Sequence, residues 1–117
     1  MHRDKVAPRL WSVAEKERLS FVYAGFSKRL GEWLLEHGHM ELAAPVVKKL
    51  VVRNELDEEA NALLLRMYAT GQDRTALETH YYAYSNLLKD ELDVRPGNAI
   101  SRLYERLQDT LDGRGTE

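Results

Sequence analysis

Apolar residues recur every three or four positions along most of the chain, which is the spacing of amphipathic helices. No stretch shows the apolar–polar alternation of a half-buried strand, so the sequence predicts an all-α fold. About five helices are expected, over residues 12–37, 40–52, 57–71, 73–92 and 98–111. Glycine or proline stands at several boundaries, notably at Gly38, Gly71 and Pro96.

The first predicted helix carries the longest apolar stripe. Ser12 and Glu15 have the spacing of a capping box, in which both side chains accept hydrogen bonds from free amides at the helix start. Gly25 and Gly31 lie inside the helix, where glycine costs about 1 kcal/mol relative to alanine, so a second helix is expected to approach closely. Gly38 is expected to end the helix in the left-handed conformation. The predicted core face is Leu19, Val22, Tyr23, Phe26, Leu30, Trp33, Leu34 and His37.

Each of the other predicted helices also has one apolar face. Asp57 and Asn98 are suitable capping residues for the third and fifth helices. The expected core positions are Leu42, Ala43, Val46, Val47, Leu50, Ala60, Leu63, Leu64, Met67, Tyr68, Ala76, Leu77, Tyr81, Tyr84, Leu87, Leu88, Ile100, Leu103, Tyr104, Leu107 and Leu111.

The spacing of small residues indicates an internal repeat. A shift of 33 residues superposes Gly38 on Gly71 and Ala43 on Ala76. This pattern resembles the tetratricopeptide helix-turn-helix repeat, although its period is one residue shorter than usual. Gly31 precedes Ala43 at the spacing that lets the two helices of a unit pack closely. We therefore predict two tetratricopeptide-like units followed by a C-terminal capping helix.

Composition narrows the class of protein. The 117 residues suffice for one domain, and 17 basic and 19 acidic residues are well mixed, which argues against nucleic-acid binding by this segment itself. The absence of cysteine excludes disulfides and thiolate sites. No apolar run approaches the roughly 20 residues that cross a bilayer, and the N-terminus lacks the apolar core of a signal peptide. A cytoplasmic protein without membrane contact is expected.

Little in the sequence suggests catalysis or metal binding. His37, His39 and Glu41 are close in sequence, but Gly38 directs the two imidazoles apart, and zinc needs three or four converging ligands. No set of nucleophile, base and orienting group is present, and no glycine-rich phosphate loop follows a strand. We expect no enzyme activity, no catalytic residue, no metal site and no cofactor.

Two surfaces are candidates for protein binding. In tetratricopeptide arrays the first helix of each unit lines a concave groove, and the predicted repeat places seven residues there: Lys28, Glu32, Leu35, Glu58, Asn61, Leu65 and Tyr68. For each of them the alternative is an ordinary solvated side chain. On the fourth helix, Tyr81 and Tyr84 share a face expected to pack on the third and fifth helices. His80 and Tyr82 are expected to stay partly exposed as an aromatic contact patch.

Three segments resemble a known family. WSVAEKERL (residues 11–19), LLKDELDVRP (residues 87–96) and LYERL (residues 103–107) are similar to the entry and closing motifs of the bacterial transcriptional activator domain. Asp93 and Gly97 replace the glycine and serine usual in the closing motif. The resemblance implies a linker or disordered arm over residues 1–10, the tetratricopeptide-like domain over residues 11–112, and a disordered tail over residues 113–117.

The resemblance also implies a function in transcription. Such domains normally follow a winged-helix DNA-binding domain in antibiotic-regulatory-type transcription factors, so this chain is expected to be the C-terminal part of a longer regulator. Its expected partners are proteins: a second copy in a homodimer, other domains of the same regulator, or RNA polymerase. The alternative is a freestanding tetratricopeptide-like scaffold that binds peptides and has no role in transcription.

Overall fold

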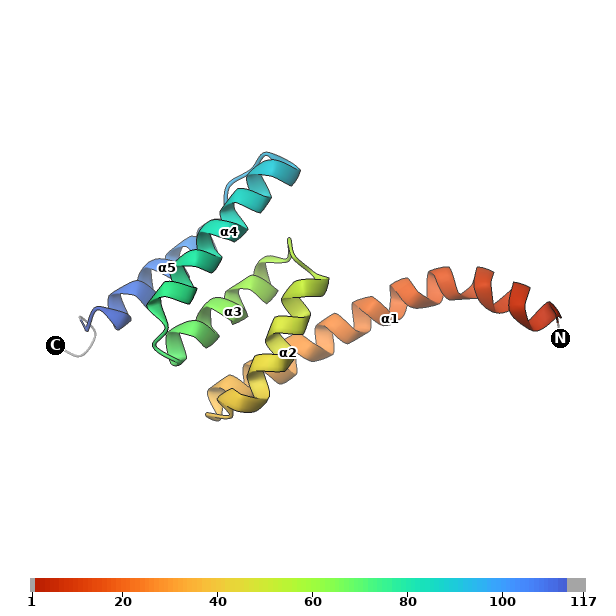
Figure 1. Cartoon of the computed structure of the whole chain (residues 1–117), viewed down its shortest axis with the longest axis horizontal. Helices are drawn as coiled ribbons and strands as arrows, with labels where there is room; N and C mark the ends of the chain where they lie inside the picture. The colour runs from red at the N-terminus through yellow and green to blue at the C-terminus, as the bar shows by residue number, and fades with distance from the viewer. Residues whose placement is uncertain (1, 114–117) are drawn as a thin grey trace.

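The computed structural model describes residues 2–113, with side chains from residue 13 onward. Within this range five helices follow one another without a strand: α1 (His2–Glu36), α2 (Met40–Arg53), α3 (Glu58–Thr70), α4 (Arg74–Leu92) and α5 (Asn98–Leu111). The molecule measures 68 × 35 × 20 Å, and the N-terminal half of α1 projects from the other helices (Figure 1). The all-α prediction is confirmed, and α2 to α5 begin and end within one residue of their predicted bounds.

The start of α1 differs from the prediction. The helix already runs from His2, so Ser12 does not cap it, and the arm expected over residues 1–10 is helical from His2 onward. Arginine, lysine, leucine and alanine, all good helix formers, occupy much of this segment and continue the helix upstream. Residues 114–117, most of the expected tail, lie outside the described residues.

Helix α3 is the central element, because opposite faces of it complete two apolar clusters. The first cluster joins α2 to α3 and consists of Val47, Leu50, Val51, Ala60, Leu63, Leu64 and Met67. The second joins α3 to α4 and α5 and consists of Leu65, Leu77, Tyr84, Leu88, Ile100 and Tyr104. Most of the predicted core positions on α2 to α5 belong to these clusters, and Asp57 caps α3 as expected, accepting from Glu59 N and Ala60 N.

The predicted core face of α1 is wrong over most of its length. Leu19, Val22, Phe26 and Trp33 keep 60%, 58%, 55% and 49% of their surface exposed, and Tyr23 and His37 are exposed as well. Helices α2 and α3 cover only the opposite side of α1, where Ser27, Gly31 and Leu34 are buried. Leu42 of α2, also predicted to be core, is 60% exposed.

The repeat has a period of 34 residues rather than the predicted 33. The left-handed positions that follow α1 and α3 are Gly38 (φ 77°) and Gln72 (φ 57°), whereas Gly71 has φ −81°. The hydrogen bonds of the two turns match at the same shift: His39 N donates to Leu34 O at 2.8 Å, and Asp73 N donates to Tyr68 O at 2.9 Å. The glycines of the two turns are therefore not equivalent.

Close helix packing at Gly31 is confirmed. A Cβ atom at this position would lie 3.0 Å from Val47 Cγ2, so α2 approaches the backbone of α1 here. A Cβ atom at Gly25 would meet only the side chain of Arg29 within its own helix, at 3.7 Å. Only Gly31 is needed for packing.

Helix α5 closes the far end of the molecule. Asp93 takes a left-handed conformation (φ 56°) after α4, and the chain then turns so that Ile100 and Tyr104 become buried. Arg74 at the start of α4 forms ion pairs with Glu78 and with Asp112 beyond the end of α5. A third full unit therefore does not follow, and α5 serves as the predicted cap.

Candidate protein-interaction site

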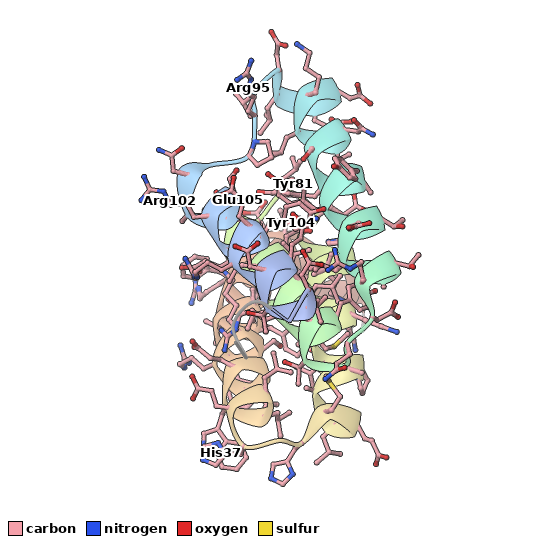
Figure 2. The ribbon with its side chains drawn as sticks, turned by 90° about the vertical axis from the view of Figure 1, so that its left-hand side faces the viewer. His37, Tyr81, Arg95, Arg102, Tyr104 and Glu105 are labelled. Carbon is pink, nitrogen blue, oxygen red and sulfur yellow. The ribbon has the colours of Figure 1, made fainter. Side chains whose placement is uncertain are left out.

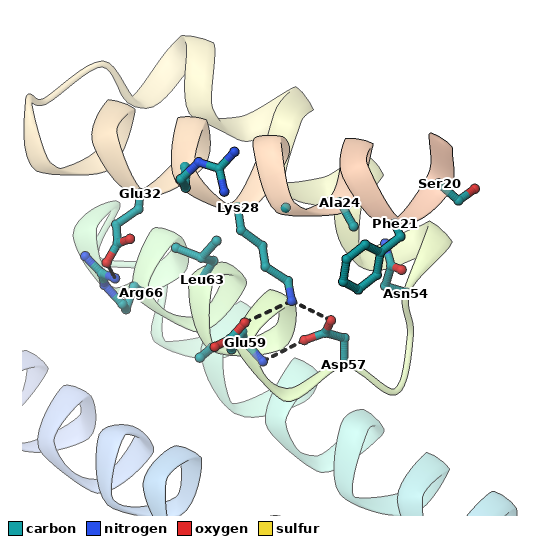
Figure 3. Close-up of a pocket in the computed structure, with 13 residues that line it drawn as sticks. Ser20, Phe21, Ala24, Lys28, Glu32, Asn54, Asp57, Glu59, Leu63 and Arg66 are labelled. Carbon is teal, nitrogen blue, oxygen red and sulfur yellow. Dashed lines mark hydrogen bonds and ion pairs between the residues drawn. The ribbon is translucent and has the colours of Figure 1, made fainter. Parts of the chain in front are cut away.

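A groove of about 680 Å³ runs between α1 and α3 (Figure 3). These are the first helices of the two units, so the groove lies where the repeat predicts a binding surface. Its residues from α1 are Ser20, Phe21, Ala24, Gly25, Lys28, Arg29 and Glu32, and those from α3 and the loop before it are Asn54, Asp57, Glu59, Ala62, Leu63 and Arg66.

An ion-pair cluster crosses the groove. Lys28 Nζ lies 2.7 Å from Asp57 Oδ2 and 2.9 Å from Glu59 Oε1 (Figure 3). Partial burial would lower the pKa of Lys28, but its hydrogen bonds to Asp57 and Glu59 outweigh this effect and raise the pKa. Burial acts in the opposite direction on Asp57, and there the hydrogen bonds from Lys28 and the α3 amides hold the pKa below its ordinary value. Asp57 therefore caps α3 and fixes α1 to it.

The remaining groove surface combines a second ion pair with an apolar end. Arg66 Nη1 lies 3.6 Å from Glu32 Oε2, so three acidic and three basic side chains line the groove and their charges balance. Phe21 is 81% exposed at one end of the groove. The arrangement suits a mixed polar and apolar protein segment better than a strongly acidic or basic ligand.

The structure places the predicted groove residues in different environments. Lys28 and Glu32 line the groove, whereas Leu35 is half-buried against the first apolar cluster. Asn61 and Leu65 are buried, so their expected exposure is wrong. Half-buried Tyr68 packs against both clusters, and the Glu58 carboxylate lies beside Gly97 at the start of α5.

The period explains which groove residues sequence reasoning missed. A shift of 33 carries Lys28 and Glu32 onto Asn61 and Leu65, while the observed shift of 34 carries them onto Ala62 and Arg66, both of which line the groove. One residue rotates a helix position by about 100°, which turns the predicted face of α3 toward α4 and α5. The usual tetratricopeptide period of 34 was the signal that could have found Ala62 and Arg66.

The expected aromatic patch is divided between two sides of α4. His80 is half-buried and its Nε2 lies 2.7 Å from Asn61 Oδ1, the acceptor end of an amide whose Nδ2 donates to Glu55 O and Asp57 O. The Nε2 atom therefore carries the proton, and burial lowers the pKa of His80. Tyr82 is 60% exposed and stands edge-on to Tyr104 of α5.

The core face of α4 follows the prediction. Tyr84 is buried, and Tyr81 stacks on Tyr104 with ring centroids 3.9 Å apart and its hydroxyl 3.0 Å from Ser101 Oγ. Burial raises the pKa of Tyr84 and of Tyr104 to about 12, so both phenols stay neutral. Figure 2 shows Tyr81 and Tyr104 together between α4 and α5.

The two histidines at the turn between α1 and α2 surround a tryptophan. The Trp33 ring stacks on His37 at 4.0 Å and on His39 at 5.7 Å, and His37 Nδ1 lies 2.8 Å from Trp33 O. Figure 2 shows His37 at the opposite end of the molecule from Tyr81 and Tyr104. Among residues 2–113, no group of three metal-ligating side chains converges and no helix is long and apolar enough to cross a membrane.

Comparison with known proteins gives one match. The model of the family described as the bacterial transcriptional activator domain matches residues 3–108. No curated protein and no solved structure matches the chain. The match covers all five helices except their outermost residues at either end.

Proposed function

Since the chain belongs to the bacterial transcriptional activator domain family, we propose that it is a regulatory protein-interaction domain of a bacterial transcriptional activator. It contacts a second copy, other domains of the same regulator, or RNA polymerase, while a winged-helix domain outside this sequence binds DNA. The family match over residues 3–108 is the observation that carries this proposal. The balanced charge of the chain supports the division of labour, because DNA binding needs clustered basic residues.

The groove between α1 and α3 is the proposed contact surface for a different protein. It is open, it presents Phe21 beside polar side chains, and its walls are held by the ion pairs of Lys28 and Arg66. Preformed walls reduce the entropy that is lost when a partner segment binds.

Binding to purified RNA polymerase and to the other domains of the regulator tests this surface. Ala62→Arg should fill the groove and abolish binding without unfolding α3, because arginine is a good helix former. Ala83→Arg, on the exposed side of α4, is the matched control and should bind normally. Equal binding by both variants would exclude the groove. A salt-resistant, sequence-specific gel shift by residues 1–117 alone would contradict the assignment of DNA binding to another domain.

The groove also keeps a second candidate function open. A freestanding scaffold would use the same walls to hold an extended peptide, with no role in transcription. Capture of such a peptide, blocked by Ala62→Arg, together with unchanged transcription when the gene is deleted, would favour the scaffold.

A further inference from the structure

The most extensive exposed apolar surface on α1 lies away from the groove. We call it the outer stripe: Leu19, Val22, Phe26, Leu30 and Trp33. At about 100° per residue these five side chains fall within an arc of roughly 80°. Leu30 is half-buried and the other four are exposed. Phe21, which lines the groove, points about 140° away from the centre of the stripe.

The internal repeat shows what kind of surface this is. The observed shift of 34 carries Phe26, Leu30 and Trp33 onto Ala60, Leu64 and Met67 of α3. These three α3 residues are 0%, 4% and 5% exposed, because α1 and α2 pack on them. The outer stripe is therefore the face that this architecture buries against another helix, and on α1 it has no neighbour among the described residues.

We propose that a second copy of this chain covers the outer stripe, by antiparallel pairing of the two α1 helices about a twofold axis at Phe26. This inference rests on the proposed function and specifies its self-association. In this register residues equidistant from Phe26 face each other, so Val22 lies level with Leu30 of the second copy and Leu19 with Trp33. Every apolar layer of one stripe thus meets an apolar layer of the other, as in helices paired through residues seven apart.

The charges that flank the stripe favour the antiparallel direction. Arg18 and Glu36 lie on the same side of the stripe at its two ends, and antiparallel pairing brings each within reach of its opposite in the second copy. Glu15 likewise lies level with His37. A parallel pair would instead place Arg18 level with Arg18 and Glu36 level with Glu36, which is repulsive.

The rest of the molecule favours pairing of stripe with stripe. The outer side of α5 carries Asn98, Arg102, Glu105, Arg106 and Asp109, so it does not offer an apolar face on which the stripe of another copy could stack. The closed twofold arrangement remains, in which the same patch is used on both subunits. Taking about 200 Å² for a large apolar side chain, each stripe supplies on the order of 400 Å² of apolar surface, typical of a small, reversible interface.

The first test is the mass of the chain in solution as a function of concentration. The unmodified chain should pass from monomer to dimer over the micromolar range, and Phe26→Glu should weaken the dimer by about 30-fold or more. Phe21→Glu is the matched control, because it alters the same residue type on the same helix at a more exposed position. It should dimerise normally. A persistent monomer, a dimer that Phe26→Glu leaves intact, or equal loss in both variants would overturn the proposal.

The second test addresses direction and register. Arg18→Glu should weaken the dimer, and adding Glu36→Arg to the same chain should restore it. The chain has no cysteine, so Phe26→Cys introduces a single thiol at the twofold axis, where two copies can form a disulfide under mild oxidation. Phe21→Cys should cross-link much more slowly. Failure of the double charge exchange to restore the dimer would overturn the antiparallel register.

These results are distinguishable from a failure of the proposed function. A monomeric chain that still binds RNA polymerase through the groove would remove the dimer and leave the regulatory role intact. A stripe dimer that binds none of the expected regulatory partners would leave self-association in place without the groove contact.

Discussion

At the scale of single residues, two glycines in equivalent-looking turns have different conformations. Gly38 has φ 77°, a conformation that costs other residues roughly 1–2 kcal/mol, whereas Gly71 has φ −81°. Gly38→Ala should therefore destabilise the chain by about 1 kcal/mol. Gly71→Ala should be neutral or stabilise it by about 0.5 kcal/mol, since its new Cβ would make only ordinary contacts at 3.6–3.7 Å.

Urea unfolding followed by circular dichroism measures both changes. Gln72→Gly completes the set: Gln72 holds the left-handed position with φ 57°, so glycine there should stabilise the chain by up to about 1 kcal/mol. Equal destabilisation by Gly38→Ala and Gly71→Ala would contradict the period of 34 residues.

His80 should make stability depend on pH in the mildly acidic range. Burial lowers its pKa below the ordinary 6.5, so the unfolded chain binds the proton more readily than the folded chain does. The contribution of His80 is therefore fully present above about pH 6.5 and is lost as the pH falls below that value.

The unfolding midpoint in urea between pH 7.5 and 5.5, by estimate the window around the ordinary histidine pKa, gives the measurement. His80→Gln keeps a donor toward Asn61 Oδ1 and does not titrate, so its midpoint should fall less on acidification. If both proteins lose the same stability, His80 is not the titrating group.

At the scale of elements, the two glycines of α1 distinguish packing from propensity. Gly25→Ala should stabilise the chain by up to about 1 kcal/mol, because it raises helix propensity and meets only the flexible end of Arg29. Gly31→Ala gains the same propensity, but its Cβ would lie 3.0 Å from Val47 Cγ2 and must displace it. Its net effect should be at least about 1 kcal/mol less favourable.

Thermal unfolding of the two variants and of Gly31→Leu checks this difference. Leucine cannot fit between α1 and α2 without moving the helices, so Gly31→Leu should cost about 2 kcal/mol or more. A stable Gly31→Leu variant would show that α2 does not pack on α1 in this manner.

The helices themselves could be predicted from the sequence because their signals are local. Asp57 caps α3 through its own side chain, and the alternation of apolar residues with Gly38 and Pro96 fixed the bounds of α2 to α5 to within one residue. The register between the units could not be read in the same way. Gly71 has the composition of a left-handed cap, but Gln72 adopts that conformation, so a match of glycines gave a period of 33 and turned the predicted groove face of α3 by about 100°.

Which apolar faces are covered depends on neighbours rather than on periodicity. Phe26 and Leu64 both stand on apolar helix faces in the sequence, yet only Leu64 has a helix packed on it. The periodicity predicted both faces as core. For the same reason Lys28 and Glu32 could be placed at the groove from α1, while Ala62 and Arg66 required the correct register of α3.

At the scale of the whole molecule, the two ends should contribute unequally to stability. Helix α5 buries Ile100 and Tyr104 against Leu65 and Leu77, and Arg74 ties its end to α4, whereas the N-terminal half of α1 projects from the other helices (Figure 1). A chain that begins at residue 19 should therefore keep a cooperative transition within a few degrees of the original. A chain that ends at residue 96 exposes the second apolar cluster and should lose the transition or melt far lower.

Calorimetry of the two truncated chains separates these outcomes, and the position of each cut sharpens the test. The N-terminal cut leaves the outer stripe and the groove residues in place, so a large loss of stability would mean that the projecting segment has contacts with the body of the molecule. The C-terminal cut leaves the first cluster intact, so a residual transition confined to α1, α2 and α3 would show that the two clusters fold separately. Since α3 carries both clusters on opposite faces, we expect one cooperative unit and no such residual transition.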